Sequence, residues 1–323
     1  QVFGLQGGAV VHIFDSLERK KIGVTYTHHE QAASLASVAY AKVSNKTGCA
    51  VVTTGPACTN AMTGLLAAWQ DSVPCIFISG QARSEHTSYN KKVRQVGTQE
   101  VNVCDIVKPI TKYAKFINNK DQFLPEIRKA INIANSGRPG PVWIDLPLEY
   151  QWSDIKYKKD KQIRKKKKSY KNKINLKNYF NKSKKPLLVL GHGIRTTIDG
   201  EKKIKNFVKK YKIPFVVTWN AADVFHSNHK LNLGIIGMSG QRGANKAVFE
   251  SDLIICLGTH LSIPHTTTLF KNYAPKSKKI IVNIDKNQLK NLKFKFDLKI
   301  NEDLGYFLDI FEKKKYRLNN KWN

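Results

Sequence analysis

The stretch His29-Glu30-Gln31-Ala32-Ala33 decides the fold of the first half of the chain, because it joins two segments of different periodicity. The apolar run at residues 23–27 before it is typical of a strand, and the Ala-rich run at residues 32–42 after it is typical of a helix. Glu30 is therefore expected in the first turn of a helix that follows a strand. Two interpretations stay open: the carboxylate stabilises the helix through the dipole, or it transfers protons in a mostly nonpolar setting.

Strand and helix signals alternate on both sides of this stretch. Candidate strands cover residues 23–28, 49–54, 75–80 and 142–146. Candidate helices cover residues 31–44, 59–70, 100–107 and 122–136. This alternation predicts an α/β domain over residues 1–151, with a doubly wound, mainly parallel sheet covered by helices on both faces. Ligands of such sheets bind outside the carboxyl ends of the strands.

The character of the sequence changes at residue 152. Residues 152–185 are rich in lysine and are expected to form an exposed basic linker. The alternation resumes with candidate strands at 186–191, 214–219, 252–258 and 279–285, and candidate helices at 201–211, 243–250 and 303–313. Residues 186–312 are therefore expected to form a second, Rossmann-like α/β domain, and residues 313–323 the start of a truncated connection.

The net charge of +31 raises the hypothesis of a nucleic-acid-binding module. The charge is unevenly distributed, with +5 over residues 1–152 and +26 over the remainder, and only nine of the 55 basic residues are arginines. Base readout and phosphate forks favour arginine, so the lysines are interpreted as a solvated surface and no specific nucleic-acid partner is expected. Weak, salt-sensitive binding of polyanions would still follow from the charge.

Two further observations bear on the location of the protein. No run of eighteen apolar residues occurs, so no membrane span and no membrane partner are expected. The five cysteines lack metal-ligand spacing and stand mostly in apolar segments. They are interpreted as free thiols in the core of a cytoplasmic protein.

Four motifs in the same order resemble the pyrimidine-binding domain of thiamine-diphosphate enzymes of the acetolactate synthase family. They lie at residues 29–33, 51–61, 71–81 and 137–145, and the resemblance runs from Val2 to about Tyr150. The second domain resembles the central domain of the same enzymes. Motifs at residues 28–31, 94–100, 106–113, 191–195, 218–220 and 258–264 are closest to the acetolactate-synthase-like proteins of polysaccharide gene clusters.

The resemblance implies a catalytic role for Glu30. In the family, the matching glutamate hydrogen-bonds N1′ of the aminopyrimidine of thiamine diphosphate and promotes removal of the thiazolium C2 proton. Thr53, Thr54, Gly55, Pro56 and Asn60 match the turn that lies against this ring. An ordinary strand-to-helix turn is the alternative for them.

Further site residues follow from the same resemblance. The loop with Gly7 and Gly8 matches one that borders the active site, with a turn that needs positive φ as the alternative. Gln99 matches a glutamine near cofactor and substrate and is expected to be catalytic, although Thr98 replaces the aromatic residue that precedes it in the family. His28 and His29 either donate to a substrate carboxylate or are satisfied by backbone groups.

Two departures from the family pattern bear on the cofactors. An Arg-Phe-Asp-Asp-Arg segment that many members place against flavin is absent, and residues 259–262 stand there instead, which argues against FAD. Arg138 matches an arginine linked to flavin, or it holds a Pro-rich turn. The Gly-Asp-Gly…Asn segment that holds Mg²⁺ and the diphosphate is also absent. No metal ligands are therefore expected here, and the sequence is expected to be a fragment of a longer product or one half of a split enzyme.

The expected activity is decarboxylation of a 2-oxo acid, pyruvate, followed by carboligation, as in acetolactate synthase. One alternative is transfer of the two-carbon unit to a keto-sugar for polysaccharide synthesis, and another is a non-catalytic subunit. The family also implies a homo-oligomer of the parent protein.

Overall fold

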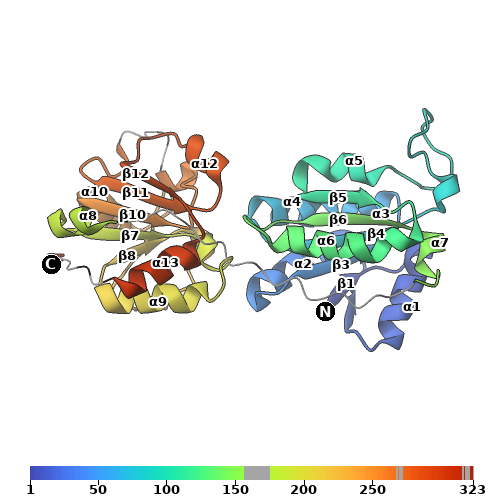
Figure 1. The fold of residues 1–323 in the computed structure, drawn as a ribbon, viewed down its shortest axis with the longest axis horizontal. Coiled ribbons are helices and arrows are strands. Elements are labelled where there is room, and N and C mark those ends of the chain that lie inside the picture. Colours follow the sequence, from blue (N-terminus) through green and yellow to red (C-terminus); the bar gives the residue numbers. More distant parts are fainter. Residues whose placement is uncertain (156–174, 267, 269–271, 315, 317–320, 323) are drawn as a thin grey trace. The chain divides into compact units, whose positions relative to one another are not determined.

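The computed structural model describes residues 1–155, 175–266, 268, 272–314, 316, 321 and 322, and the chain divides into two compact units, Gln1–Arg164 and Lys165–Asn323. Within these residues each unit contains one sheet of six strands, and all strand pairs are parallel. Helices flank both sheets (Figure 1). The prediction of two α/β, doubly wound domains with parallel sheets is therefore confirmed.

The sheet of the first unit has the strand order β2-β1-β3-β4-β6-β5. Its strands are β1 (Val2–Gly4), β2 (Val24–Tyr26), β3 (Gly48–Val52), β4 (Cys75–Gln81), β5 (Tyr113–Phe116) and β6 (Val142–Pro147). From β1 the chain passes to β2 on one side, whereas from β3 it passes to β4 on the other. The order therefore reverses between β1 and β3, and a crevice for ligands is expected at the carboxyl ends of these two strands.

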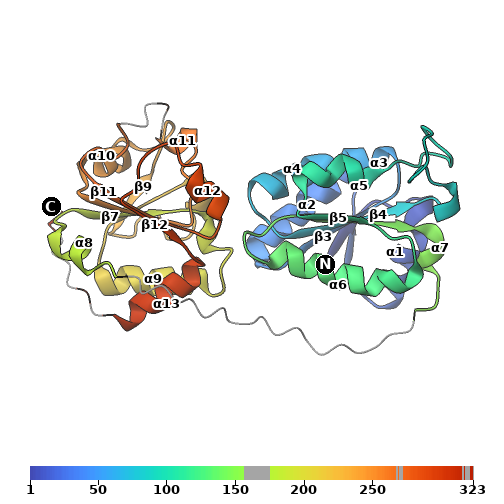
Figure 2. The ribbon, with the colours of Figure 1, turned by 45° about the horizontal axis from the view of Figure 1, so that its top comes forward.

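Helices cover both faces of this sheet (Figure 2). They are α1 (Val11–Arg19), α2 (Glu30–Ser44), α3 (Pro56–Asn60), α4 (Met62–Gln70), α5 (Val103–Val107), α6 (Phe123–Asn135) and α7 (Leu148–Gln151). Helices α2 to α5 bury their apolar side chains on one face, around Phe77 and Trp143. Helices α1 and α6 pack on the other face, against Ile144 and Val51. Apolar residues on both sides of each inner strand explain why these strands read as continuous apolar runs.

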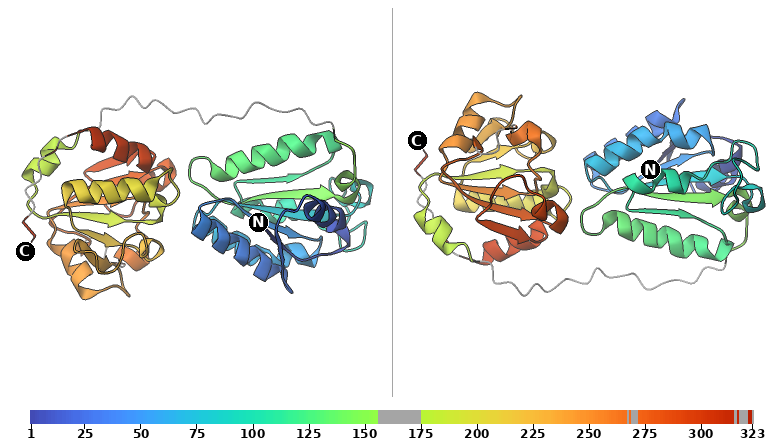
Figure 3. Two further views of the ribbon diagram at one scale, coloured as in Figure 1. Left: turned by 90° about the horizontal axis from the view of Figure 1, so that it is seen from below. Right: turned by 90° about the horizontal axis from the view of Figure 1, so that it is seen from above.

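The sheet of the second unit has the strand order β12-β11-β10-β7-β8-β9. Its strands are β7 (Pro186–Leu190), β8 (Phe215–Val217), β9 (Asn232–Ile235), β10 (Leu253–Leu257), β11 (Lys278–Asn283) and β12 (Leu298–Asn301). Its helices are α8 (Lys177–Lys182), α9 (Gly200–Tyr211), α10 (Arg242–Glu250), α11 (Ile263–Thr266), α12 (Lys286–Lys290) and α13 (Leu304–Lys313). Helices α8, α9 and α13 cover one face, whereas α10 and α12 cover the other (Figure 3).

The predicted strands and helices all occur, with shifts at their ends. The helix expected at residues 59–70 is divided at Ala61 into α3 and α4. The helix expected at 100–107 begins only at Val103, after Asn102 whose side chain caps it. Strands β1, β5, β9 and β12 were not predicted. None of the described helices is long and apolar enough to cross a membrane.

The expected exposed linker at residues 152–185 requires a correction at its end. Residues 156–174 lie outside the described part of the chain, but residues 177–182 form α8. Leu176 and Phe180 are fully buried, and Phe180 packs edge-on against Phe311 with 5.8 Å between ring centroids. The prediction of a solvated tether is wrong for this part, because two apolar side chains among the lysines are enough to attach α8 to the core.

We expect Phe180→Ala to destabilise the second unit by about 3–5 kcal/mol, the usual cost of removing a large aromatic side chain from a core. Asn178→Ala on the exposed side of the same helix is the matched control and should change stability by less than about 0.5 kcal/mol. Urea unfolding followed by circular dichroism measures both. Equal effects of the two substitutions would show that α8 is not part of the core.

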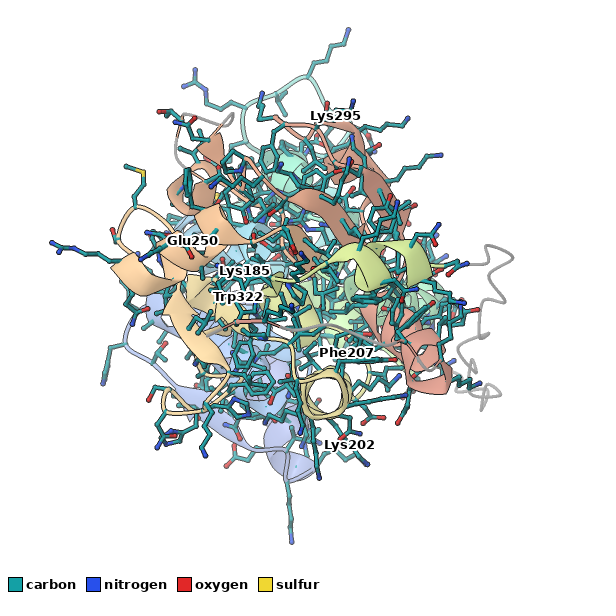
Figure 4. All side chains as sticks on the ribbon, turned by 90° about the vertical axis from the view of Figure 1, so that its left-hand side faces the viewer. Lys185, Lys202, Phe207, Glu250, Lys295 and Trp322 are labelled. Carbon is teal, nitrogen blue, oxygen red and sulfur yellow. The ribbon has the colours of Figure 1, made fainter. Side chains whose placement is uncertain are left out.

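The start of β7 is held by residues from three parts of the second unit. Figure 4 shows Lys185 beside Trp322. The ammonium of Lys185 lies 5.4 Å from the centroid of the Trp322 ring and 3.5 Å from a carboxylate oxygen of Glu250. The indole nitrogen of Trp322 donates a hydrogen bond of 2.7 Å to the carbonyl of Pro186. Trp322 therefore belongs to this unit, next to its central strands.

Candidate functional site

The loops at the carboxyl edge of the first sheet carry most of the residues predicted to bind a cofactor. Gly7 and Gly8 follow β1, Glu30 follows β2, and residues 53–56 follow β3. These three strands are neighbours in the sheet, and the strand order reverses between β1 and β3. The topology thus gathers residues from distant parts of the sequence at the place where such sheets bind ligands.

Glu30 is the first residue of α2 and is buried, with 9% of its surface exposed. Asn60, the last residue of α3, donates a hydrogen bond of 3.0 Å from Nδ2 to Oε2 of Glu30. Among the described residues the other oxygen, Oε1, has no hydrogen-bond partner. The two predicted residues are therefore in contact, and one carboxylate oxygen is left for a further donor.

The loops after β1 and β3 touch each other across the reversal point. A Cβ atom on Gly7 would lie 2.7 Å from Cβ of Thr53, so only glycine permits this approach. The amide of Ala9 donates to the hydroxyl of Thr53 over 3.3 Å. Gly8 is different, because no heavy atom lies within 4 Å of the position of its absent Cβ. The side of this loop at Gly8 is open.

Gln99 lies against the turn after β3. Gly55 has a φ of 65° and a ψ of −127°, and a Cβ atom there would lie 2.3 Å from the carbonyl oxygen of Gln99. Gln99 is exposed and itself has a φ of 57°, a left-handed conformation that is costly for a residue with a side chain. The predicted residues Gly55 and Gln99 are thus neighbours, although 44 positions separate them in the sequence.

The hydroxyl of Thr54 is directed into the protein interior. It donates a hydrogen bond of 2.9 Å to Oε1 of Gln81, and only 9% of the residue is exposed. The hydroxyl of Thr54 is therefore engaged inside the protein, where it holds the turn after β3. Pro56 follows as the exposed first residue of α3, where its missing N–H is tolerated.

A buried polar network beneath these loops was not predicted. It consists of Thr54, Ser79, Gln81, Tyr89 and Asp145. The carboxylate of Asp145 accepts hydrogen bonds from Ser79 Oγ (2.6 Å), Gln81 Nε2 (3.0 Å) and Tyr89 OH (3.1 Å). Burial raises the pKa of Asp145 to about 7, and the three donors oppose this shift without cancelling it. Polar residues within the apolar strands β4 and β6 were the signal in the sequence for this network.

The histidines and Arg138 lie outside the contacts described so far. His28 and His29 are exposed, and His29 caps α2 by accepting a hydrogen bond of 3.1 Å at Nδ1 from the amide of Gln31. This hydrogen bond supports the alternative in which a backbone group satisfies the Nδ1 atom of His29. Arg138 precedes β6, at the amino edge of the sheet, and its Nε donates to Ser72 Oγ over 2.7 Å. It holds a turn on the edge opposite to the site.

The glycine-rich loops of the second unit serve close packing. Its strand order reverses between β7 and β10, and the loops after these strands carry Gly193 and Gly258. The amide of Gly193 donates to the carbonyl of Gly258 over 2.9 Å, and a Cβ atom on Gly193 would lie 2.7 Å from Cα of Gly258. The backbones of the two loops are therefore in direct contact at this point.

The donor set of the first unit fits an organic ring better than a metal ion. Within the described ranges there is no group of three or more histidine, cysteine, aspartate or glutamate side chains that could hold a metal. Glu30 instead offers one carboxylate oxygen, Oε1, without a partner among the described residues, while Asn60 holds the other. This arrangement suits a flat heterocycle with a protonated ring nitrogen.

Comparison with known proteins gives two family matches, one in each unit. Residues 1–106 match the N-terminal TPP binding domain of thiamine pyrophosphate enzymes. Residues 175–310 match the central domain of thiamine pyrophosphate enzymes. The second match begins within the segment expected to be a linker, in agreement with the buried position of Phe180.

Curated relatives give a consistent result. The chain is 34% identical over 294 residues to the acetolactate synthase large subunit of Haemophilus influenzae, covering 88% of this chain and 50% of that protein. It is 33% identical over 294 residues to the acetolactate synthase large subunit of Buchnera aphidicola subsp. Schizaphis graminum, with the same coverages. For that of Lactococcus lactis the identity is 34% over 266 residues, covering 80% of this chain and 45% of the relative. The chain thus spans about half the length of the curated relatives it matches.

Proposed function

The chain belongs to the thiamine pyrophosphate enzyme family, and we propose that it provides the aminopyrimidine-binding part of a thiamine-diphosphate-dependent, acetolactate synthase-like enzyme. The proposed reaction is decarboxylation of a 2-oxo acid, pyruvate, followed by transfer of the remaining two-carbon unit to a second carbonyl compound. The observation that carries this proposal is the buried carboxylate of Glu30, held on one oxygen by Asn60 and unpartnered on the other among the described residues.

Each residue of the site has a defined task in this proposal. Glu30 would share a proton between Oε1 and a ring nitrogen of the bound cofactor, and the low exposure of the residue, 9%, limits competition from water. Asn60 fixes the carboxylate by its hydrogen bond to Oε2. Gly7 and Gly8 let the backbone approach the ring closely. When bound, thiamine diphosphate supplies a thiazolium carbon that adds to the keto carbon of the substrate and accepts the electron pair released with carbon dioxide.

We also propose a metal ion, an oligomeric state and a cell compartment for the parent protein. Mg²⁺ would bind the diphosphate through residues outside those of this site, because a diphosphate requires a metal or an array of donors. The parent protein would be a cytoplasmic homo-oligomer that acts on a small 2-oxo acid. The free cysteines support a reducing compartment.

A second candidate acceptor is a keto-sugar, as in polysaccharide synthesis. Thr98 stands next to Gln99 where the family has an aromatic residue, and it is exposed. A smaller side chain at this place would admit a bulkier acceptor than pyruvate. The motifs shared with polysaccharide-cluster proteins point in the same direction.

The proposed function is tested with the full-length protein, pyruvate, thiamine diphosphate and Mg²⁺. We expect release of carbon dioxide and formation of 2-acetolactate, measured by mass spectrometry of the products. Carbon dioxide release that requires an added keto-sugar, with a two-carbon extended sugar as product, would favour the second candidate. Absence of decarboxylation with every acceptor, together with absence of cofactor binding in calorimetry, would indicate a non-catalytic subunit.

A further inference from the structure

The buried polar network beneath the site joins parts of the chain that are distant in sequence. Asp145 is fully buried in β6, next to β4, which carries Ser79 and Gln81. Its Oδ2 atom accepts hydrogen bonds from Gln81 and from Tyr89, which lies on the loop between β4 and α5. A buried carboxylate costs free energy unless it is satisfied, so the network is retained only where the contacts repay this cost.

Gln81 uses its whole side-chain amide. Nε2 donates to Asp145 Oδ2 over 3.0 Å and to the carbonyl of Val101 over 2.9 Å. Oε1 accepts from the hydroxyl of Thr54 and from the amide of Ala82, both over 2.9 Å. With both donors and both lone pairs occupied, the amide connects the turn after β3 to the loop that carries Gln99.

The loop of residues 84–102 is also attached to the sheet at Tyr89, and its own residues are joined to one another at Glu100. Tyr89 stacks on Phe116 with 4.1 Å between ring centroids and donates its hydroxyl to Asp145. Glu100 is buried and accepts from Ser88 Oγ and from the amide of Val96. Between these points the loop is largely exposed.

The position of Gln99 tolerates little displacement. Its carbonyl lies against Cα of Gly55, in a space too small for a Cβ atom, and its own φ of 57° must be imposed by its surroundings. Val101, two residues further on, is the point at which Gln81 holds this loop. The network thus fixes the two sides of the Gly55–Gln99 contact, one through Thr54 and the other through Val101.

We propose that Asp145 and Gln81 are positioning residues that lock the loop of residues 84–102, and with it Gln99, against the turn at Gly55. Asp145 acts through Gln81 and Tyr89 and touches neither substrate nor cofactor. The importance of this position for catalysis rests on the function proposed above. The attachment of the loop to the turn at Gly55 does not depend on the proposed function, and it is tested without the cofactor.

The principal test is Asp145→Asn in the chain of 323 residues. Asparagine has one acceptor oxygen where aspartate has two, so it cannot accept from Ser79, Gln81 and Tyr89 at once, and at least one of these three hydrogen bonds is lost. Trypsin cleavage at the exposed Lys91, Lys92 and Arg94, mapped by mass spectrometry, should become at least about tenfold faster, because the loop opens more often. In amide NMR spectra the signals of Gly55 and Gln99 should shift.

Asp252→Asn is the matched control. Asp252, in the second unit, also accepts three hydrogen bonds, from Ser183 Oγ (2.5 Å) and from the amides of Lys184 (2.7 Å) and Lys185 (3.0 Å). It should leave both the cleavage at residues 91–94 and the signals of Gly55 and Gln99 unchanged. If Asp145→Asn prevents folding, Tyr89→Phe removes one hydrogen bond to Asp145, keeps the ring stacking, and should speed cleavage about three- to fivefold.

The proposal is overturned if the Asp145 and Tyr89 variants leave cleavage at these sites at the control rate, or if the Gly55 and Gln99 signals do not move. It is also overturned if cleavage rises equally throughout the first unit, since that result indicates general destabilisation. Faster cleavage at residues 91–94 in the Asp145 variant would support the attachment of the loop even if the full-length protein decarboxylates no 2-oxo acid. The second result would contradict the proposed function alone.

Discussion

Glu30→Gln should slow the exchange of the thiazolium C2 proton of bound thiamine diphosphate by about two or more orders of magnitude, the usual scale for loss of an acid–base group. Glutamine has the same shape and can still accept the hydrogen bond that Asn60 now donates to Glu30. It cannot hold a proton between its side chain and a ring nitrogen. Exchange into deuterium, quenched with acid and read by proton NMR of the full-length protein with cofactor, measures the effect.

The alternative interpretation of Glu30 predicts a different outcome. If the carboxylate only stabilises the start of α2, its loss costs about 0.3–1 kcal/mol of stability and leaves proton exchange unaffected. Glu201, in the first turn of α9 in the second unit, is a matched control for this helix effect. Glu201→Gln should leave exchange unchanged. Equal exchange rates in the wild type and Glu30→Gln would refute the catalytic role of Glu30.

Much of the fold was predictable because the inner strands are buried on both faces. Such strands read as continuous apolar runs, and β3, β4, β6, β7, β8 and β10 were all expected near their observed positions. Strands β5, β9 and β12 are short and lie toward or at the sheet edges, with mostly intermediate exposure. Their sequences carry weaker apolar signals, so local patterns could not reveal them.

The linker error has a related cause. A run of like charges usually marks a solvated segment, and residues 175–185 are rich in lysine. The lysine content is an average over the whole segment, whereas packing of the segment against a core depends on single apolar residues. Leu176, just before α8, and Phe180, within it, reach the core, while Lys177, Lys182 and Lys184 stay exposed.

The sequence allowed the residues of the site to be predicted, but it did not allow the contacts between them to be predicted. The resemblance identified Glu30, Asn60, Gly55 and Gln99 singly. Their pairing depends on the loops that follow β2 and β3 and on the course of residues 84–102, which no local pattern specifies. The role of Gln81 depends on the adjacency of β4 and β6, two strands separated by a complete strand in the sequence.

A second large effect is expected at Gly55. We expect Gly55→Ala to destabilise the first unit by roughly 2–4 kcal/mol, because two penalties act together. A φ of 65° with a ψ of −127° is a conformation that only glycine adopts readily. The new methyl group would also lie 2.3 Å from the backbone oxygen of Gln99, which cannot rotate away as the end of a side chain would.

Gly8→Ala makes the same chemical change in a neighbouring loop and is the matched control. No heavy atom lies within 4 Å of the added group there, so stability should change by less than about 0.5 kcal/mol. Urea unfolding of both variants separates the contributions of strain and contact from the general effect of replacing a loop glycine. A Gly55→Ala protein as stable as the Gly8→Ala protein would mean that Gln99 does not press on this turn in solution. The contact on which the locked loop depends would then be absent.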